Sequence, residues 1–410
     1  MKRVLVILSM ISMRLFAAFE AQEAYEAYVY GETIDGLPGP PCPPSPQFSA
    51  LYPTYAINTL THSTSATPFQ AVQITSMATS PDGQSLYIGP ITDLDTGVQT
   101  VGIISTSTNT QIASLPVNTI DPTTSFPVVN SDHFACLAPT PDGQYLCVGI
   151  QDDSTMPFSY YVRVWDLMFP AINPVAKWNI NNPIQAIAFS QDSKTAYVLS
   201  GENFSGEYIT FVDVDTGTVG TPISLGTLGV IGNFQNQIAV SQNGNYVYVP
   251  YSDGDHAFLQ IIETQSPYTQ NTVDLGATTT TPVSIITPLN VNVGNFAFVQ
   301  LSNAIYAVDT TTNMMPMSFI AYPFNDICSY QNSIAITPDG NQVYVGCLGY
   351  VNILGNLMDS LEPFHQVITQ VTTQVNGNTT TQPANNYMIT ITPKPPAPVA
   401  ISKKNYPGLN

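Results

Sequence analysis

Basic residues are scarce in this chain of 410 residues, which has 9 Lys and Arg against 28 Asp and Glu and a formal net charge of −19. Three of the nine, Lys2, Arg3 and Arg14, lie near the N-terminus, so few remain for the rest of the protein. Nucleic-acid binding depends on clustered Lys and Arg that displace counterions from phosphates. The composition therefore excludes nucleic acid and an anionic membrane surface as partners.

Charge of either sign is also sparse, at 9% of residues, whereas 44% are apolar and much of the remainder is Thr, Asn, Gln, Ser and Pro. Exposed helix surfaces normally carry Glu, Lys and Arg. Thr, Asn, Ser and Pro are instead typical of strands and of the turns between them. The composition predicts an all-β protein with many turns.

Long apolar runs are missing except at the N-terminus, where residues 1–21 combine a basic start, an apolar run interrupted by Arg14, and small residues. This pattern predicts a secretory signal peptide, too short for a transmembrane anchor, and the alternative is an uncleaved N-terminal anchor. We therefore expect an exported protein, periplasmic or extracellular, with no membrane span after signal removal. Residues 22–50 contain GLPGPPCPPSP and are interpreted as a Pro-rich linker.

The five cysteines show no C-x-x-C spacing, so a zinc or redox motif is not expected. Cys136 and Cys147 flank one turn as diagonal neighbours, near the limit of about 7 Å for a disulfide. Cys328 and Cys347 flank another turn with a larger offset. Export would permit both disulfides, and the alternative is that these residues are small buried hydrophobes.

A hairpin pattern recurs along the chain: an alternating apolar strand, a tight turn such as SPDG or TPDG, and a second alternating strand. The turn positions follow one another after 60, 50, 51, 50 and 46 residues, at Gly83, Gly143, Ser193, Gly244, Gly294 and Gly340. Asp and Gly favour such turns, so we interpret Asp82, Asp142 and Asp339 as turn formers and not as catalytic acids.

Two further strands around a second turn follow most of these hairpins, as in YITFVDVDTGTVGTPISL from Tyr208. Four antiparallel strands every fifty residues cannot form a core alone, but they can when they pack face to face around an axis. The repeat therefore predicts a β-propeller. Tyrosines at one position of the second strand (Tyr87, Tyr197, Tyr248 and Tyr344) are expected to pack between sheets.

The segments Phe211–Gly217 and Ile334–Gly346 match a pattern that resembles the YVTN-type repeat β-propeller family, which includes lactonase-like seven-bladed propellers. The resemblance covers roughly residues 55 to 402. It implies a seven-bladed β-propeller at 51–402, closed by N-terminal and C-terminal strands that share one blade, with a tail at 403–410. For that blade we expect two strands from Tyr55–Val72 and a two-stranded hairpin from Tyr387–Ser402.

Acidic residues gather in the loops after the second strand of four successive repeats, which a propeller would bring to one face. These are Asp93 and Asp95, Asp152 and Asp153, Glu202 and Glu207, and Asp253 and Asp255. Links between repeats add Asp121, Asp132 with His133, and Asp326. Such a face would attract a cationic ligand, a basic peptide or Ca²⁺. The alternative is that these acids are solvated and keep the protein soluble.

Catalytic and metal-binding motifs are few. The histidines (His62, His133, His256 and His365) are scattered, and no H-E-x-x-H, G-x-S-x-G or G-x-G-x-x-G motif is present. His133 beside Asp132, and His256 beside Asp255, are the available acid/base pairs. The sequence SDGD at 252–255 lacks the spacing of a full calcium loop, so no cofactor is expected and Ca²⁺ is kept only as an alternative.

The sugar-lactone hydrolases that the resemblance includes act on phosphosugars, which call for Arg and Lys. Here Arg163 is the one arginine after Arg14, so phosphate recognition is poorly supplied. The aromatic residues Phe158, Tyr160, Phe204 and Tyr251 are expected in or near loops, where they can contact a partner. We thus expect a monomeric, non-enzymatic binding module for an unknown protein, peptide or small cationic ligand. The alternatives are a lactonase-type hydrolase and a purely structural surface protein, which the Thr- and Asn-rich composition also suits.

Overall fold

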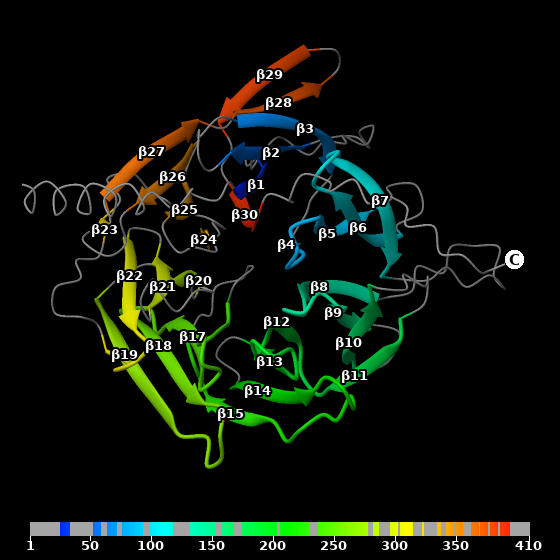
Figure 1. Ribbon diagram of the computed structural model, residues 1–410. Helices are drawn as coiled ribbons and strands as arrows, with labels where there is room; N and C mark the ends of the chain where they lie inside the picture. The colour runs from blue at the N-terminus through cyan, green and yellow to red at the C-terminus, as the bar shows by residue number, and fades with distance from the viewer. Residues whose placement is uncertain are drawn as a thin grey trace, which may run out of the picture.

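Figure 1 shows the computed structural model of the chain. It describes residues 25–32, 52–58, 64–71, 76–92, 98–117, 132–152, 157–167, 174–202, 206–229, 237–277, 282–286, 296–301, 304–314, 322–323, 334–337, 342–347, 350–355, 362–368, 370–375, 378–383 and 386–393. Among these residues no helix is long and apolar enough to cross a membrane.

The described residues form seven four-stranded antiparallel sheets and one two-stranded sheet, which makes the chain an all-β protein. We number six of the large sheets by their order in the chain. Sheet I contains β4 (Ser76–Thr79), β5 (Ser85–Thr92), β6 (Gln99–Ser105) and β7 (Thr110–Pro116). Sheet II contains β8 (Asp132–Pro139), β9 (Tyr145–Asp152), β10 (Ser159–Asp166) and β11 (Ala176–Ile180). Sheet III contains β12 (Ile184–Phe189), β13 (Thr195–Glu202), β14 (Gly206–Asp213) and β15 (Ile223–Gly226).

The next three sheets repeat the same order of strands. Sheet IV contains β16 (Ala239–Val240), β17 (Tyr246–Ser252), β18 (His256–Glu263) and β19 (Gln270–Ala277). Sheet V contains β20 (Pro282–Ile286), β21 (Phe296–Leu301), β22 (Ala304–Asp309) and β23 (Tyr322–Pro323). Sheet VI contains β24 (Ile334–Ile336), β25 (Gln342–Cys347), β26 (Tyr350–Gly355) and β27 (Glu362–Ile368).

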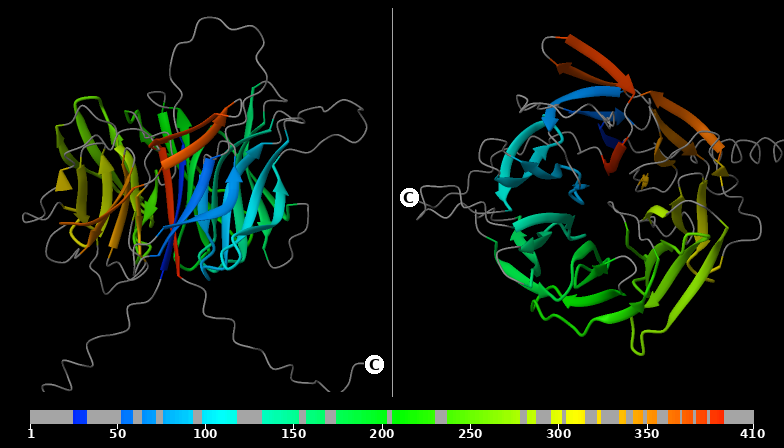
Figure 2. Two further views of the ribbon diagram at one scale, coloured as in Figure 1. Left: turned by 90° about the horizontal axis from the view of Figure 1, so that it is seen from above. Right: turned by 180° about the vertical axis from the view of Figure 1, so that it is seen from behind.

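The sheets lie around a common centre, as in a β-propeller (Figure 1). The first strand of a sheet lies toward the centre, as β4, β8 and β12 show, and the fourth strand lies outside, as β7, β11 and β15 show. Seen from the side, the strands run along the axis of the ring (Figure 2). Each sheet therefore presents one face to the preceding sheet and one to the following sheet.

Strands from both ends of the chain form the seventh large sheet, called here the terminal sheet. It contains β30 (Asn386–Pro393), β1 (Tyr25–Glu32), β2 (Tyr52–Asn58) and β3 (Thr64–Ala71), with β1 paired to β30 along its whole length. Three of these strands come from the N-terminal end of the chain and only β30 from the C-terminal end, so the expected division into two and two is wrong. Since β1 lies inside 22–50, the linker interpretation does not hold for Tyr25–Glu32. Residues 394–402, expected as the second strand of a C-terminal hairpin, lie outside the described residues.

A two-stranded sheet, β28 (Gln370–Val375) with β29 (Asn378–Pro383), lies outside the ring beside the terminal sheet (Figures 1 and 2). The sequence pattern predicted no strands in this region. Its Thr-rich segments, QVTTQV and NTTTQP, have the β-branched composition that favours strands.

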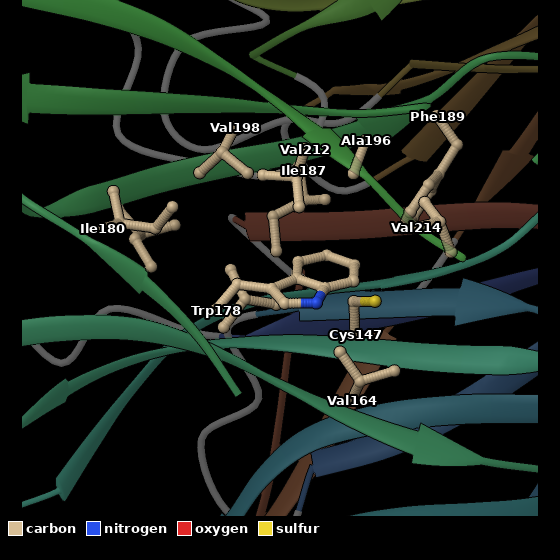
Figure 3. Packing of buried hydrophobic residues seen from close by; sticks show 12 residues of the cluster. Cys147, Val164, Trp178, Ile180, Ile187, Phe189, Ala196, Val198, Val212 and Val214 are labelled. Carbon is tan, nitrogen blue, oxygen red and sulfur yellow. The ribbon is translucent and has the colours of Figure 1, made fainter. Parts of the chain in front are cut away.

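The hydrophobic core is divided into layers between neighbouring sheets. Figure 3 shows the layer between sheets II and III, where Trp178 lies among Cys147, Val164, Val198 and Val212. Equivalent layers separate sheets I and II, III and IV, IV and V, and V and VI. The second-strand tyrosines Tyr87, Tyr197 and Tyr248 are buried in these layers, which confirms that they pack between sheets, and Tyr344 is buried as well.

The repeated turns share one set of hydrogen bonds. A hydroxyl donates to an Asp or Asn side-chain oxygen two residues later at 2.6–2.7 Å, and that oxygen accepts the backbone N–H two residues further on. The residue after the Asp or Asn has a positive φ of 61–74°. The pairs are Ser80 and Asp82, Thr140 and Asp142, Ser190 and Asp192, and Ser241 and Asn243. Asp82 and Asp142 are therefore turn formers, as predicted, whereas Asp339 lies outside the described residues.

One consequence can be tested at Asp142, whose Oδ1 accepts bonds from the Thr140 hydroxyl at 2.6 Å and the Gln144 N–H at 3.0 Å. Asp142→Ala removes both, and we expect it to lower the free energy of unfolding by about 1–2 kcal/mol. Asp142→Asn keeps the acceptor oxygen, as Asn243 does in its own turn, and should cost less than about 0.5 kcal/mol. Urea unfolding followed by circular dichroism distinguishes the two. Equal losses would show that the acceptor oxygen has no role.

The described cysteines do not form a disulfide. Cys136 and Cys147 are both free thiols. In the β8–β9 pairing Cys136 lies opposite Gly149 and Cys147 opposite Ala138, which is the predicted diagonal arrangement. Burial raises the pKa of Cys136 to about 12 and also raises that of Cys147. Cys147 is buried in the layer between sheets II and III and Cys136 packs against it partly buried, so both behave as small hydrophobes. Cys328 lies outside the described residues, as does the side chain of Cys347.

Candidate functional site

The ends of the second strands carry several of the predicted site residues on the same side of successive sheets. Asp152 ends β9, Glu202 ends β13, and Asp253 directly follows β17. At each of these ends the chain turns into the third strand of its sheet. Asp93, Asp95 and Asp153 lie outside the described residues, and so do Asp121 and Asp326. Glu202 is placed only by its backbone.

Sheet II brings two predicted acids opposite each other. Asp132, the first residue of β8, is the register partner of Asp152, and His133 is opposite Gln151. The Asp152 side chain is half-buried, and Ser159 Oγ donates to its Oδ2 at 3.4 Å. The side chains of Asp132 and His133 are outside the described portion of the chain. Their closeness to Asp152 is therefore a matter of backbone register alone.

Glu207 does not belong to an exposed acidic face, which corrects the prediction. It is the second residue of β14 rather than a loop residue, and its side chain is fully buried. Its Oε2 accepts the backbone N–H of Leu228 at 2.9 Å. Glu207 therefore fastens the segment after β15 to sheet III. The burial of Glu207 was not predicted, because the strand begins earlier than expected, at Gly206, directly opposite Glu202.

An acidic turn at residues 253–255 joins β17 to β18 in sheet IV. Asp253 Oδ1 accepts the backbone N–H groups of Asp255 at 2.9 Å and His256 at 2.8 Å. Gly254 between the acids has a φ of 103°, which favours glycine there. The backbone donors from His256 and Asp255 lower the pKa of Asp253, and Asp253 and Asp255 are both exposed. The turn thus presents two carboxyl groups to solvent and fixes the start of β18.

His256 pairs with Asp274 on β19 and not with its neighbour Asp255. Its Nδ1 lies 3.1 Å from Asp274 Oδ1 and 3.0 Å from Oδ2. The backbone N–H of Gly276 and then the bond from His256 lower the pKa of Asp274. The two side chains are 41% and 53% exposed, so a partner in solution can reach both. The sequence did not predict this pair, which we treat as part of the candidate site.

A register argument could have found Asp274. In the β18–β19 hairpin, Ile262 is opposite Gln270, and counting outward from that pair places Phe258 opposite Asp274. His256 is two residues from Phe258 and so lies on the same face of the strand. A bulge between Ala257 and Phe258 then shifts the register by one residue.

Three aromatic rings continue the site across sheet IV. Tyr251 on β17 stacks on Phe258 with ring centroids 5.1 Å apart and planes 23° apart. Phe258 stacks on His256 at 6.0 Å and 21°. Partial burial raises the pKa of Tyr251, so its hydroxyl stays neutral near neutral pH. We call Tyr251, Asp253, Phe258, His256 and Asp274 the sheet IV site; Figure 1 shows its strands, β17, β18 and β19.

Other candidate groups lie elsewhere. Of the predicted aromatic residues, Phe158 directly precedes β10 and is 40% exposed, and Tyr160 is half-buried in β10. Phe204 is outside the described residues. Arg163 donates to the Val117 carbonyl oxygen and to the Tyr161 hydroxyl, and the Lys177 ammonium lies 3.6 Å from the Tyr161 ring centroid. These two cations thus contact the junction of sheets I and II.

The sheet IV site favours interaction with a cation. Carboxylates attract positive charge, and aromatic faces do so through their quadrupole. Within the described ranges no group of three or more His, Cys, Asp or Glu side chains is arranged to hold a metal ion. A histidine bonded to a carboxylate through Nδ1 can also serve as an acid or base through Nε2.

The acid stability of the fold should report on the carboxylates of this site. Since the pKa values of Asp253 and Asp274 are lowered by folding, each favours the folded state above the ordinary Asp pKa of about 3.9. This contribution is lost as the pH falls through the lower folded-state values. Urea midpoints between about pH 5 and 2 should therefore fall less steeply in Asp253→Asn/Asp274→Asn than in the unchanged protein. Identical slopes would contradict the assignment.

Comparisons with known proteins bear on the fold alone. No family model and no curated protein matches the chain. Among solved structures, a Lactobacillus plantarum protein is similar at 11% identity and TM-score 0.56, covering 89% of this chain and 99% of the other. A Bacteroides fragilis protein provisionally described as a 6-phosphogluconolactonase is similar at 10% identity and TM-score 0.55, covering 90% and 99%. A functionally unknown Desulfotomaculum acetoxidans protein follows at 14% and 0.51, covering 82% and 95%. These likenesses support the β-propeller fold.

Proposed function

We propose that the chain is a non-enzymatic binding propeller that holds a cationic ligand or a basic partner at the sheet IV site. The observation that carries the proposal is the pairing of His256 with Asp274 beside the stacked rings of Tyr251 and Phe258. Strand register brings these groups together from three strands, and Asp253 adds a second carboxylate with a lowered pKa. Binding groups are commonly displayed at loop ends on a rigid scaffold in this way.

Charge supports the same choice of ligand. A chain with net charge −19 repels anions, and its acidic turn focuses negative potential where Asp253, Asp255 and Asp274 are exposed. The pKa of Asp253 and that of Asp274 are lowered, so these two carboxyl groups are charged at neutral pH. A basic peptide or protein surface is therefore the expected partner, and nucleic acid is not.

The scaffold we propose is a seven-bladed ring closed by the terminal sheet. In support, contacts between sheets run from β30 to β4, β4 to β8, β8 to β12, β12 to β16, β17 to β20, β20 to β24 and β24 back to β30. The antiparallel pairing of β1 with β30 joins the two ends of the chain within one sheet. A closed ring has no exposed inner edges and holds each loop in a fixed place. We further propose that the protein is a monomer.

Export belongs to the same proposal. Cleavage near residue 21 would remove the basic, apolar leader and leave β1, which begins at Tyr25, intact for the terminal sheet. N-terminal sequencing of the mature protein should begin close to residue 22. An unprocessed Met1 terminus would contradict export by this route.

Calorimetric titration with a short basic peptide, acetyl-Gly-Arg-Gly-Lys-Gly-Arg-amide, tests the binding function. We expect saturable binding that weakens as salt is raised, because screening reduces the attraction of exposed charges. Asp253→Asn/Asp274→Asn should weaken binding at least about tenfold. The matched control, Asp192→Asn/Asp213→Asn, changes the net charge equally at turn-forming acids of sheet III and should bind as the unchanged protein does. Equal weakening in both variants would reduce the effect to net charge and contradict the site.

A lactonase-type hydrolase is the second candidate, favoured by the His256–Asp274 pair, which has the form of a general-base dyad. Basic side chains that could bind a phosphosugar are few, because Arg163 already donates to the Val117 carbonyl oxygen and to the Tyr161 hydroxyl. We expect no turnover of gluconolactone above the buffer rate. Turnover that His256→Gln abolishes would favour the hydrolase over the binding module.

A further inference from the structure

We propose that the sheet IV site recognises an arginine side chain of a peptide or protein, in preference to a lysine. This inference rests on the proposed binding function and narrows its ligand class. It depends on the shape of the site, whereas the binding function depends mainly on its charge. The two can therefore fail separately.

Planarity is the first reason. The rings of Tyr251, Phe258 and His256 are nearly parallel, with 23° and 21° between successive planes. His256 is the first residue of β18, directly after the turn, and its side chain is 41% exposed. The group of rings thus includes an imidazole that solvent can reach. A guanidinium is a planar cation that stacks on such a surface, whereas an ammonium is a compact, strongly hydrated charge that gains less from stacking.

The position of the carboxylates is the second reason. Asp274 is the register partner of Phe258 and is bonded to the imidazole edge, so its carboxylate lies at the side of the stack. Asp253 and Asp255 are in the turn that leads into His256. A guanidinium has five N–H donors in a rigid fork and can reach acceptors at its edge while its face is stacked. The lysine ammonium instead carries its three N–H donors on a single nitrogen atom.

The remaining ligand chemistry fits less well. In the described portion of the chain no His, Cys, Asp and Glu side chains gather in groups of three for a metal ion. Phosphate and carboxylate ligands would meet the charges of Asp253 and Asp274. An arginine guanidinium can instead stack on the imidazole of His256 and donate hydrogen bonds to the neighbouring carboxylates.

Competition calorimetry with three tripeptides tests the proposal, each peptide displacing the basic peptide described above. The probes are acetyl-Gly-Arg-Gly-amide, its lysine counterpart of equal charge, and its citrulline counterpart, which is nearly isosteric with arginine but neutral. We expect the arginine peptide to compete about tenfold more strongly than the lysine peptide, a difference within reach of one stacked cation. The citrulline peptide should not compete.

Variants separate the stack from the charge. Phe258→Leu leaves the carboxylates in place and should reduce the advantage of the arginine peptide over the lysine peptide from about tenfold to less than about twofold. Thermal melts followed by circular dichroism check that the variant is folded, and Tyr251→Leu provides a second test on the neighbouring strand should Phe258→Leu unfold. If arginine and lysine compete equally in the unchanged protein, the arginine inference falls and the binding function stands. If the basic peptide itself does not bind, both fall.

Discussion

Replacing Trp178 by alanine is expected to lower the free energy of unfolding by about 3–5 kcal/mol, the usual cost of removing a large buried aromatic side chain. Trp178 is 2% exposed and lies in the layer between sheets II and III (Figure 3). Its ring contacts side chains from both sheets, and the ideal Cβ position of Gly217 is 3.3 Å from its Nε1. No small rearrangement of this layer can fill the volume that the indole leaves.

Trp178→Phe is the matched control. The indole N–H is buried and has no hydrogen-bond partner in the structure, so its loss removes an unsatisfied donor. A phenyl ring also keeps much of the packing. We expect Trp178→Phe to lower the free energy of unfolding by less than half as much as Trp178→Ala does. Urea unfolding can be followed by the fluorescence of Trp165, since the chain has two tryptophans. If both variants were as stable as the unchanged protein, the layer between sheets II and III would not be the packed core described here.

Replacing Gly229 by alanine is expected to disrupt the sheet IV site from a distance in sequence. Gly229 is buried, and a Cβ on it would overlap the carbonyl oxygen of Ser252 and stand 2.9 Å from the Cα of Asp253. The obstructing atoms belong to the backbone, so they cannot rotate away as a side chain could. We expect destabilisation near the upper end of the usual range of about 1–3 kcal/mol for overpacking. Displacement of Asp253 should also weaken binding of the basic peptide about tenfold or more.

Gly226→Ala provides the comparison for this prediction. Gly226 has a φ of 81°, and a Cβ there would meet nothing within 4 Å. It should therefore cost only the strain of a left-handed residue, about 1 kcal/mol, and leave peptide binding unchanged. Calorimetric titration and urea unfolding of both variants provide the measurements. Normal peptide binding by folded Gly229→Ala would show that the segment after β15 does not position the acidic turn.

The repeated turns explain why so much of the fold was predictable. A Ser or Thr followed by Pro-Asp-Gly encodes its own hydrogen bonds within five residues, as Thr140 and Asp142 illustrate. Alternating apolar residues on both sides then specify the two strands of the hairpin. This information is local, so it could be recognised at four described turns without knowledge of the rest of the chain.

The terminal sheet was harder to predict because its strands come from opposite ends of the chain. The alternation of YEAYVYGE at 25–32 is a strand signal, but the Pro-rich segment after it led to a linker interpretation for the whole of 22–50. The partner strand β30 lies more than 300 residues away. Pairing between such distant segments leaves no short-range pattern in either of them.

The candidate site was predicted only in part for a related reason. Asp253 and Asp255 could be placed in a turn from their sequence, but the partner of His256 depends on the register of β18 with β19. That register includes a bulge, which shifts the pairing by one residue. Glu207 was misplaced because one residue decides whether a side chain near a strand end faces solvent or the next sheet.

The most direct test of the account is an NMR titration of the four histidine imidazoles with the basic peptide at neutral pH, using protein labelled at histidine and the signal assigned by His256→Gln. If the peptide binds at the sheet IV site, the His256 signal should show a saturable shift that follows the calorimetric binding curve. The shift should be absent in Asp253→Asn/Asp274→Asn. A peptide that binds while the His256 signal stays in place would contradict the sheet IV site as the place of recognition.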